Sequence, residues 1–188
     1  VSSAPRRLTV LLNDETKDVA DGNYKHCFVV NKLDHYIYTV MVKGQLVRIK
    51  PNTRTCELLL KKVGTSTRPD ACDSYLAFSP VKGQENMLYV AMAEGNQIWR
   101  VDVGNLEGKD KNTYPGEGYA GKAILEGQVA GAGWEDGLLR NAKFDNPHQI
   151  CFTEDGKLYI ADCGNNCIRV IDTKLPLDRA MVTTPIGL

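Results

Sequence analysis

Short apolar runs alternate with polar turns along most of this chain, and helical periodicity is almost absent. The clearest example is residues 129–172, where a glycine-rich lead precedes three apolar runs separated by tight turns. Val, Ile, Leu, Tyr and Phe fill the runs, as in β-strands, while Gly, Asn and Asp occupy the turns. The pattern predicts an antiparallel β-unit in which each strand pairs with the next.

The same unit occurs twice more in the preceding part of the chain. Two residue types mark the repeat, a tyrosine in the second run (Tyr38, Tyr89, Tyr159) and an arginine in the third (Arg48, Arg100, Arg169). Superposing the arginines aligns the units at spacings of roughly 50 to 70 residues. The predicted strands are 26–30, 36–40, 45–50 and 56–61 in the first unit, 74–79, 87–91, 97–102 and 123–128 in the second, and 149–153, 157–161, 167–172 and 179–184 in the third.

Units of four strands repeated at such spacings are typical of a β-propeller. We therefore predict an all-β chain with propeller blades of four antiparallel strands at residues 23–64, 65–128 and 129–188. A polar, glycine-rich segment, 104–121, accounts for the longer second spacing. It is predicted to form a surface loop ahead of the fourth strand of the middle blade.

Two segments depart from the four-strand pattern. Residues 1–22 contain one apolar run, Leu8–Leu12, and are predicted to form the outer strand of a preceding blade plus a linker. Residues 136–143 (DGLLRNAK) have a short helical pattern. One or two helical turns are therefore predicted before the first strand of the last blade.

Three blades do not close a ring, because propellers have about four to eight. An open array leaves an apolar face uncovered at each end, which protein surfaces rarely tolerate over a large area. We therefore expect the ring to be completed by the remaining blades of a longer chain or by a second copy.

Charge excludes some classes of partner. Lys plus Arg and Asp plus Glu are both 23, so the formal net charge is zero. Nucleic acids and anionic membrane surfaces attract clustered positive charge, so neither is expected as a partner. No apolar run approaches the ~18 residues that cross a bilayer, so no membrane insertion is expected. The chain starts at Val1 without a basic stretch leading into an apolar segment, so no signal peptide is visible.

The six cysteines do not form a metal-binding pattern. Cys163 and Cys167 are the closest pair, as C-x-x-x-C across a turn. A structural zinc needs four ligands, and no second pair follows at the usual spacing. Two alternatives stay open for this pair: a disulfide across the hairpin or two reduced thiols.

The last unit resembles the NHL repeat in its lead (GAGWEDG), in the approach to its first strand (AKFDNP) and in its second and third strands (DGKLYIAD and NNCIR). The matching residues are Gly133, Asp136, Gly137, Ala142, Phe144, Pro147, Asp155, Gly156, Leu158, Tyr159, Ile160, Asp162, Asn165, Ile168 and Arg169. The two earlier units match weakly. The resemblance implies a ring of about six blades. It also implies a bacterial protein of the periplasm or cell surface, often with an IPT/TIG domain.

Most of the matching residues have a mechanical explanation. Asp155–Gly156 provides the positive-φ turn of a two-residue hairpin. Asp162 and Asn165 are expected to bond to backbone amides in the next turn. Tyr159 is expected to fill the space between neighbouring blades. Arg169 is expected to lie along apolar surface with its guanidinium on a carbonyl or carboxylate at the blade edge.

Four residues remain as candidates for ligand binding: His148, Gln149, Trp134 and His26. His148 and Gln149 stand where the family commonly has Pro-x-Gly, at the start of a first strand, and first strands line the channel of a propeller. A histidine there can ligate metal, act as a base, or simply bond to a neighbouring backbone group. His26 has a comparable position two blades earlier. Trp134, in the glycine-rich lead, can stack on a sugar or a peptide.

No catalytic motif is present: G-x-S-x-G, H-E-x-x-H and a phosphate loop are all missing. The expected function is a noncatalytic scaffold, without cofactor, that binds a protein or glycan. The alternative, implied by the resemblance to amidating lyases and lactonases, is a hydrolase or lyase with calcium or zinc in the central channel. RNA binding, as in animal NHL proteins, ranks last because basic and acidic residues are balanced.

Overall fold

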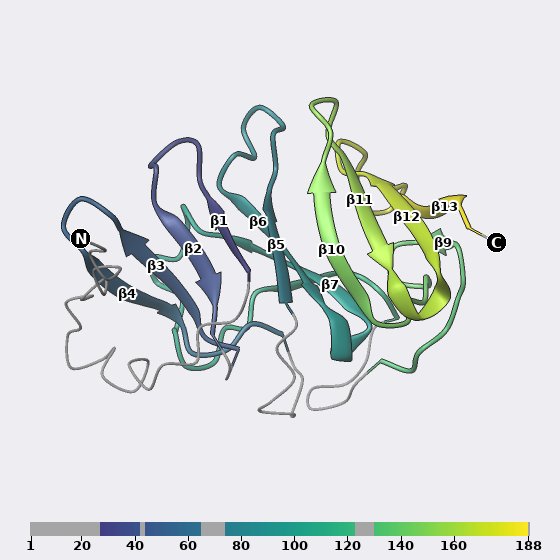
Figure 1. Ribbon diagram of the computed structural model, residues 1–188, viewed down its shortest axis with the longest axis horizontal. Coiled ribbons are helices and arrows are strands. Elements are labelled where there is room, and N and C mark those ends of the chain that lie inside the picture. The colour runs from purple at the N-terminus through teal and green to yellow at the C-terminus, as the bar shows by residue number, and fades with distance from the viewer. Residues whose placement is uncertain (1–26, 42–43, 65–73, 123–129, 188) are drawn as a thin grey trace, which may run out of the picture.

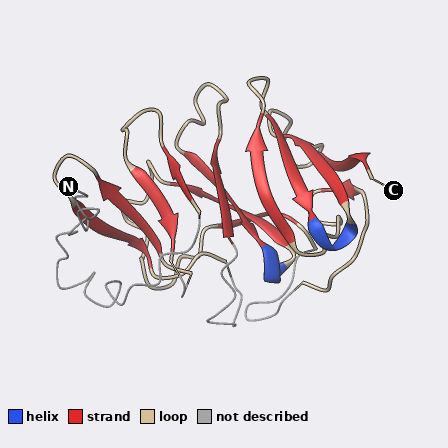
Figure 2. Ribbon diagram, in the orientation of Figure 1, coloured by secondary structure: helices blue, strands red, loops and turns tan. Residues whose placement is uncertain are grey.

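The structure, a computed structural model, describes residues 27–41, 44–64, 74–122 and 130–187, and its regular elements are almost all β-strands (Figures 1 and 2). Within those ranges the helical elements are two single-turn 3-10 helices, η2 (Ala93–Gly95) and η3 (Cys163–Asn165). Neither has the length or apolar character to cross a membrane.

The strands form three antiparallel sheets that follow one another in chain order (Figure 1). The first blade contains β1 (Phe28–Val30), β2 (Ile37–Val40), β3 (Leu46–Lys50) and β4 (Thr55–Leu60), the middle blade contains β5 (Ser74–Phe78), β6 (Met87–Met92), β7 (Gln97–Asp102) and β8 (Glu117–Ala120), and the last blade contains β10 (Pro147–Phe152), β11 (Lys157–Asp162), β12 (Cys167–Asp172) and β13 (Met181–Ile186). A short strand, β9 (Gly137–Leu138), joins the last blade beside β13. The prediction of an all-β chain built from three four-stranded propeller blades is confirmed.

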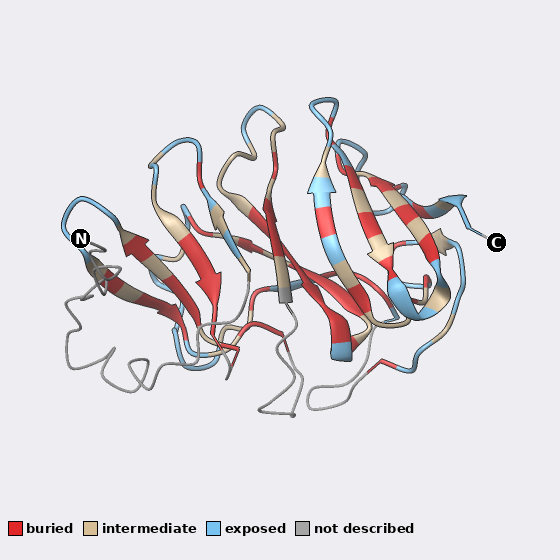
Figure 3. Cartoon of the chain, in the orientation of Figure 1, coloured by how far each residue is buried: buried red, intermediate tan, exposed pale blue. Residues whose placement is uncertain are grey.

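The hydrophobic core lies between the blades, and β6 of the middle blade contributes to both sides of it (Figure 3). Leu88 and Val90 pack against the first blade, while Tyr89 and Ala91 pack against the last. All four are fully buried. Because neighbouring side chains of a strand point to opposite faces, a strand covered on both faces is a continuous apolar run. This explains the sequence MLYVAM of β6.

The same aromatic contact joins the blades at both junctions. Phe78, the last residue of β5, meets Tyr38 edge-on at 5.1 Å and 78°. Phe152, the last residue of β10, meets Tyr89 edge-on at 5.2 Å and 72°. Such pairs contribute about 0.5–1.5 kcal/mol beyond the area that they bury. The two contacts place the first strands β1, β5 and β10 next to one another in the centre of the array (Figure 1).

The fourth strand of the middle blade is not where the sequence pattern placed it. Residues 117–120, predicted as part of a loop, form β8 and pair with β7. Tyr119 buries its ring between the blades, and Glu117 forms an ion pair with Arg100 at 3.0 Å. These two contacts let a short segment with a central glycine complete the blade. The predicted strand at 123–128 lies outside the described residues.

Residues 136–143 do not form the predicted helical turns. Gly137 and Leu138 pair with β13 as strand β9, and a single turn follows, closed by a hydrogen bond from the Ala142 amide to the Leu138 carbonyl at 3.0 Å. The available edge of β13 therefore outweighs a weak local helical preference.

The turn after β10 is also longer than the predicted two residues, because Gly156 N–H bonds to the Thr153 carbonyl at 2.9 Å. Gly156 has the expected positive φ, +82°.

The three arginines of the repeat are not structurally equivalent. Arg48 and Arg100 pair across the ladder with Tyr38 and Tyr89, but Tyr159 pairs with Val170, one residue beyond Arg169. An offset of one residue moves a side chain to the other face of the sheet. Superposing the arginines was therefore wrong for the last blade, and Arg169 points to the opposite face, where it is buried.

The predicted strand at Leu8–Leu12 and the candidate His26 lie outside the described residues.

Candidate ligand-binding groove

An open groove of about 390 Å³ runs across the ends of the three first strands. Its floor is apolar and comes from all three blades: Val29 and Val30 of β1, Leu76 and Ala77 of β5, and Ile150 of β10. Phe78 and Phe152, the residues of the two aromatic junctions, also line it. The groove therefore exists because those junctions hold the first strands side by side.

The rim of the groove is polar and comes from the turns that follow the first strands. It consists of Lys32, Ser79, Pro80, Glu85, Thr153 and Glu154. Glu85 accepts a hydrogen bond from the Gly83 amide at 2.8 Å, which fixes its turn. Ligand sites commonly have such a lining: the apolar floor buries an apolar group of the ligand, and the few charged groups at the edge orient the ligand by polar contacts.

The tyrosines beneath the groove are built into the junctions. Burial raises the pKa of Tyr38, and the hydrogen bond that Tyr38 Oη donates to Asp34 at 2.6 Å raises it further. Burial also raises the pKa of Tyr89. Both phenols therefore stay protonated at all physiological pH values, and they act as packing groups that hold the floor.

His148 and Gln149 lie at the other end of β10 from the groove. A register irregularity separates Pro147 from Ile150 in the pairing of β10 with β11, so the two residues sit in a bulge. His148 stacks on Tyr75 of β5, with ring centroids 5.4 Å apart and planes at 28°. Gln149 is exposed. The structure does not bring these two candidates together with Trp134, and none of the three lines the groove.

Trp134 is an exposed aromatic residue with a fixed orientation. Its indole is 63% exposed, and its Nε1 donates to Thr184 Oγ1 at 3.2 Å. Thr184 in turn donates to Asp136 Oδ1 at 2.8 Å. This chain of hydrogen bonds connects an exposed ring on the last blade to the buried polar centre described next.

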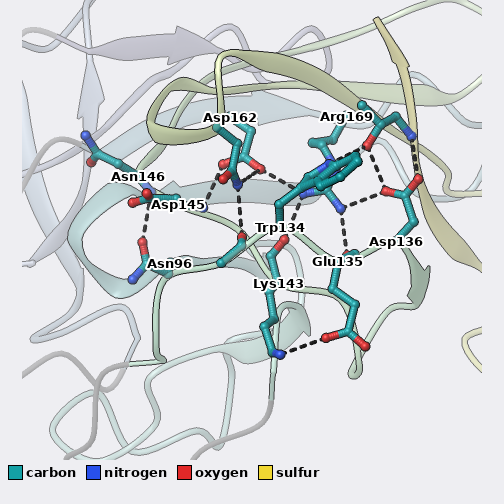
Figure 4. Close-up of polar contacts among 12 residues, drawn as sticks. Asn96, Trp134, Glu135, Asp136, Lys143, Asp145, Asn146, Asp162 and Arg169 are labelled. Carbon is teal, nitrogen blue, oxygen red and sulfur yellow. Dashed lines mark hydrogen bonds and ion pairs between the residues drawn. The ribbon is translucent and has the colours of Figure 1, made fainter. Parts of the chain in front are cut away.

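Arg169 is the polar centre of the last blade (Figure 4). Its side chain is completely buried, and its guanidinium donates four hydrogen bonds. Nη1 bonds to the Lys143 carbonyl at 2.8 Å and to Asp162 Oδ2 at 2.7 Å, and Nη2 bonds to the Glu135 carbonyl at 2.8 Å and to Asp136 Oδ1 at 2.9 Å. The predicted contacts of Arg169 with carbonyl and carboxylate groups are confirmed. They tie the lead and the approach to β10 onto the blade.

Asp162 has a different partner from the predicted one. Its Oδ1 accepts from the Asp145 amide at 2.8 Å, and its Oδ2 accepts from Asn165 Nδ2 at 2.8 Å (Figure 4). Asn165 Nδ2 also donates to the Gly133 carbonyl at 2.9 Å. Both residues thus hold the segment before β10, and the bond between their side chains links the end of β11 to the turn that follows it. The glycine-rich lead needs this support because it has little apolar surface of its own.

The cysteines and acidic residues give no sign of a metal centre in the described ranges. No group of three or more His, Cys, Asp or Glu residues lies together there in a way that would hold a metal ion. The five cysteines of those ranges are free, Cys163 and Cys167 included. Of the two alternatives for that pair, the structure therefore has the reduced thiols.

Residues 144–171, from the approach to β10 to the end of β12, match the family model of the NHL repeat. The likeness to the NHL repeat covers this one segment of the last blade. The matched segment includes Asp162 and Arg169, so the buried ion pair of the last blade belongs to the repeat itself. The first and middle blades share its four-stranded architecture.

Curated relatives match this chain over part of its length. Protein SUPPRESSOR OF QUENCHING 1, chloroplastic, from Arabidopsis thaliana is 36% identical over 52 residues, which is 28% of this chain and 5% of that protein. Teneurin-1 from Caenorhabditis elegans is 32% identical over 112 residues, which is 59% of this chain and 4% of that protein. The chain thus corresponds to a small part of each of these much longer proteins.

Solved structures from Bacteroides thetaiotaomicron share the fold. One is an auxiliary nutrient binding protein, with a TM-score of 0.60 and 20% identity over 84% of this chain and 35% of that one. Another is a structural genomics protein of unknown function, with a TM-score of 0.59 and 20% identity over 86% of this chain and 36% of that one. The chain spans about a third of each structure, and at this identity the likeness shows the fold alone.

The sequence pattern did not identify the groove. Its floor consists of ordinary strand residues such as Leu76 and Ile150, which come from separate blades and meet through the junctions. The available signal was the phenylalanine at the end of two first strands, Phe78 and Phe152. Given that first strands line a propeller channel, this repeat pointed to the place where three strand ends meet.

Proposed function

We propose that the protein is a noncatalytic scaffold that binds an apolar segment of a partner protein in the groove across β1, β5 and β10. The groove carries this proposal, because its floor is apolar and its rim offers both signs of charge, with Lys32 opposite in sign to Glu85 and Glu154. A glycan would need exposed aromatic rings and convergent polar groups, whereas the floor offers mainly aliphatic side chains.

The groove is built from elements that bind without rearranging. Its walls are strands whose side chains are fixed by the two aromatic junctions, so little conformational entropy is lost when a ligand docks. The turns at its rim connect strands that are already paired with each other, and Glu85 anchors one of these turns. Pre-organisation of this kind suits a scaffold that presents one surface.

The test measures binding of the protein to an array of short peptides that contain Leu, Ile and Phe, and in parallel its binding to a glycan array. Glu154→Arg places a long cationic side chain at the mouth of the groove, and Asp178→Arg makes the same charge change in an exposed loop outside it. We expect Glu154→Arg to weaken peptide binding by about tenfold or more, which is about 1.4 kcal/mol. Asp178→Arg should leave it unchanged.

Two results would assign a different function. Glycan binding that is lost in Trp134→Ala, without peptide binding, would transfer the role to the exposed indole of the last blade. Loss of a hydrolase or lyase activity on chelation of calcium or zinc would favour the metal-dependent enzyme. Peptide binding that is equal in both arginine variants would show that the groove is not the site.

A location outside the cytoplasm, at the cell surface or in the periplasm, is a further part of the proposal, and the NHL resemblance motivates it. Fractionation of cells of the native source, with detection of the protein by antibody, tests this part of the proposal. We expect the protein in the periplasmic or surface fraction, and recovery in the cytoplasmic fraction would contradict it.

A further inference from the structure

The middle blade packs against the last blade through one of its two faces. The corresponding face of the last blade points outward and carries the same types of residue. In the pairing of the second and third strands, three positions carry the same residue type in both blades: Tyr89 and Tyr159, Ala91 and Ala161, Ile98 and Ile168. The three residues of the middle blade are fully buried against the last blade. The three of the last blade are only half-buried. We call Tyr159, Ala161 and Ile168 the acceptor face.

A hydrogen-bonding group is repeated beside this face. Asn96 and Asn166 follow η2 and η3, and both have left-handed backbone conformation with φ +52°. Asn96 holds the segment that leads into the last blade, because its Nδ2 donates to the Ala130 carbonyl at 2.9 Å and its Oδ1 accepts from the Asn146 amide at 2.8 Å. Asn166 is exposed, and its side-chain amide has no hydrogen-bond partner in the described part of the chain.

We propose that the acceptor face and Asn166 bind a further propeller blade of the same kind. The two existing junctions define its chemistry. Its first strand would end in a phenylalanine that meets Tyr159 edge-on, as Phe78 meets Tyr38 and Phe152 meets Tyr89. Its lead segment would present one carbonyl and one amide to Asn166. An apolar molecule without such a backbone could cover the acceptor face, but it would leave the side-chain amide of Asn166 without a hydrogen-bond partner.

A second copy of this chain fits the face less well than such a blade. Val30 pairs with Ile37 at the ladder position where Phe78 pairs with Leu88. A second copy would therefore offer a valine in place of the aromatic ring, and the edge-to-face contact with Tyr159 would not form. The geometry thus favours a blade with the aromatic residue over association of two copies.

The chain itself supplies a blade for the test. Residues 129–188 carry the lead, Phe152 and the acceptor face, so a second copy of this segment, added after Leu188, should dock onto the first. Cys151 reports the docking: it is exposed now, whereas Ala77, at the same ladder position of the middle blade, is buried. We expect alkylation of this thiol to slow by about tenfold or more in the extended chain.

Substitutions in the acceptor face should matter only when the added blade is present. In the extended chain, Tyr159→Ser should raise the equilibrium constant for unfolding by about tenfold, and Asn166→Ala by about three- to tenfold. In the original chain each change should be less than about threefold, since neither residue has a partner blade there. Leu175→Ser, in an exposed loop outside the face, should act equally in both chains.

Three results would overturn the proposal. One is an extended chain whose added blade is digested by protease while the first Cys151 reacts as fast as before. Another is an equal effect of Tyr159→Ser in the two chains. The third is an original chain that sediments as a dimer and dissociates in Tyr159→Ser, because this would assign the face to a second copy.

Discussion

Replacing Arg169 with methionine removes the charge at the centre of the last blade while keeping a long side chain there. Arg169 is fully buried, and the carboxylate of Asp162, 2.7 Å from its Nη1, is fully buried as well. The variant leaves that carboxylate without its cation. Asp136 is affected less, because its side chain is 44% exposed and water can replace the lost partner.

The expected loss of stability is about 3–5 kcal/mol, the usual cost of removing one partner from a buried ion pair. This corresponds to an unfolding equilibrium constant larger by about two to four powers of ten. Most of the cost comes from the unpaired charge of Asp162, so Asp162→Asn in the same chain should recover part of it. The amide keeps an oxygen that can accept from the Asp145 amide.

Urea unfolding followed by tryptophan fluorescence measures the effect, and Arg100→Met is the matched control. Arg100 lies in the corresponding strand of the middle blade, but it is 21% exposed and its partner Glu117 is 56% exposed. A surface pair of this kind contributes about 0–1 kcal/mol. Equal losses in the two methionine variants would refute the explanation. So would a double variant, with Asp162→Asn, that is less stable than Arg169→Met alone.

Three further outcomes follow from the local geometry. Gly156→Ala should cost about 1–2 kcal/mol by thermal unfolding, because φ is +82° and a Cβ would lie 2.7 Å from a side chain of the middle blade; Gly131→Ala, with open space around it, should cost nothing measurable. Burial acts to raise the pKa of the Glu57 carboxyl, but the hydrogen bond and charge of Arg48 outweigh it and hold that pKa below the usual range. Its contribution to stability is therefore present above the pKa of an unfolded glutamate and is lost as pH falls through the lower folded value, so Arg48→Met should raise the pKa in an NMR titration and move acid unfolding to higher pH; an unchanged titration would contradict this. Burial raises the pKa of the Cys167 thiol, which should react with iodoacetamide only after unfolding, and a thiol that stays unreactive in urea without reductant would indicate a disulfide.

The repeated strands were predictable because each one carries its own signal. The tyrosine of the second run and the apolar residues around it place β2, β6 and β11 within a residue or two of the observed bounds. β8 was missed because EGYA is too short and too polar to be identified alone, and only its pairing with β7 makes it a strand. The equivalence of the arginines failed for a similar reason, since register is a property of two strands and not of one.

The candidate site was less predictable than the fold. His148 and Gln149 stood out because they depart from the repeat, but His148 is used in a stack with Tyr75. Nothing in the sequence near Leu76 or Ile150 distinguishes the floor of the groove from the core. A surface that forms where three blades meet depends on their relative placement, which local composition does not encode.

The aromatic junctions also give the array a direction. In both of them the tyrosine belongs to the earlier blade and the phenylalanine to the later one. A ribosome therefore releases each receiving tyrosine before the phenylalanine that docks on it. Growth of the nascent chain can therefore add blades one at a time, each docking onto the blade completed before it. The apolar surface open to misassembly then stays limited to the two end faces of the array at any moment.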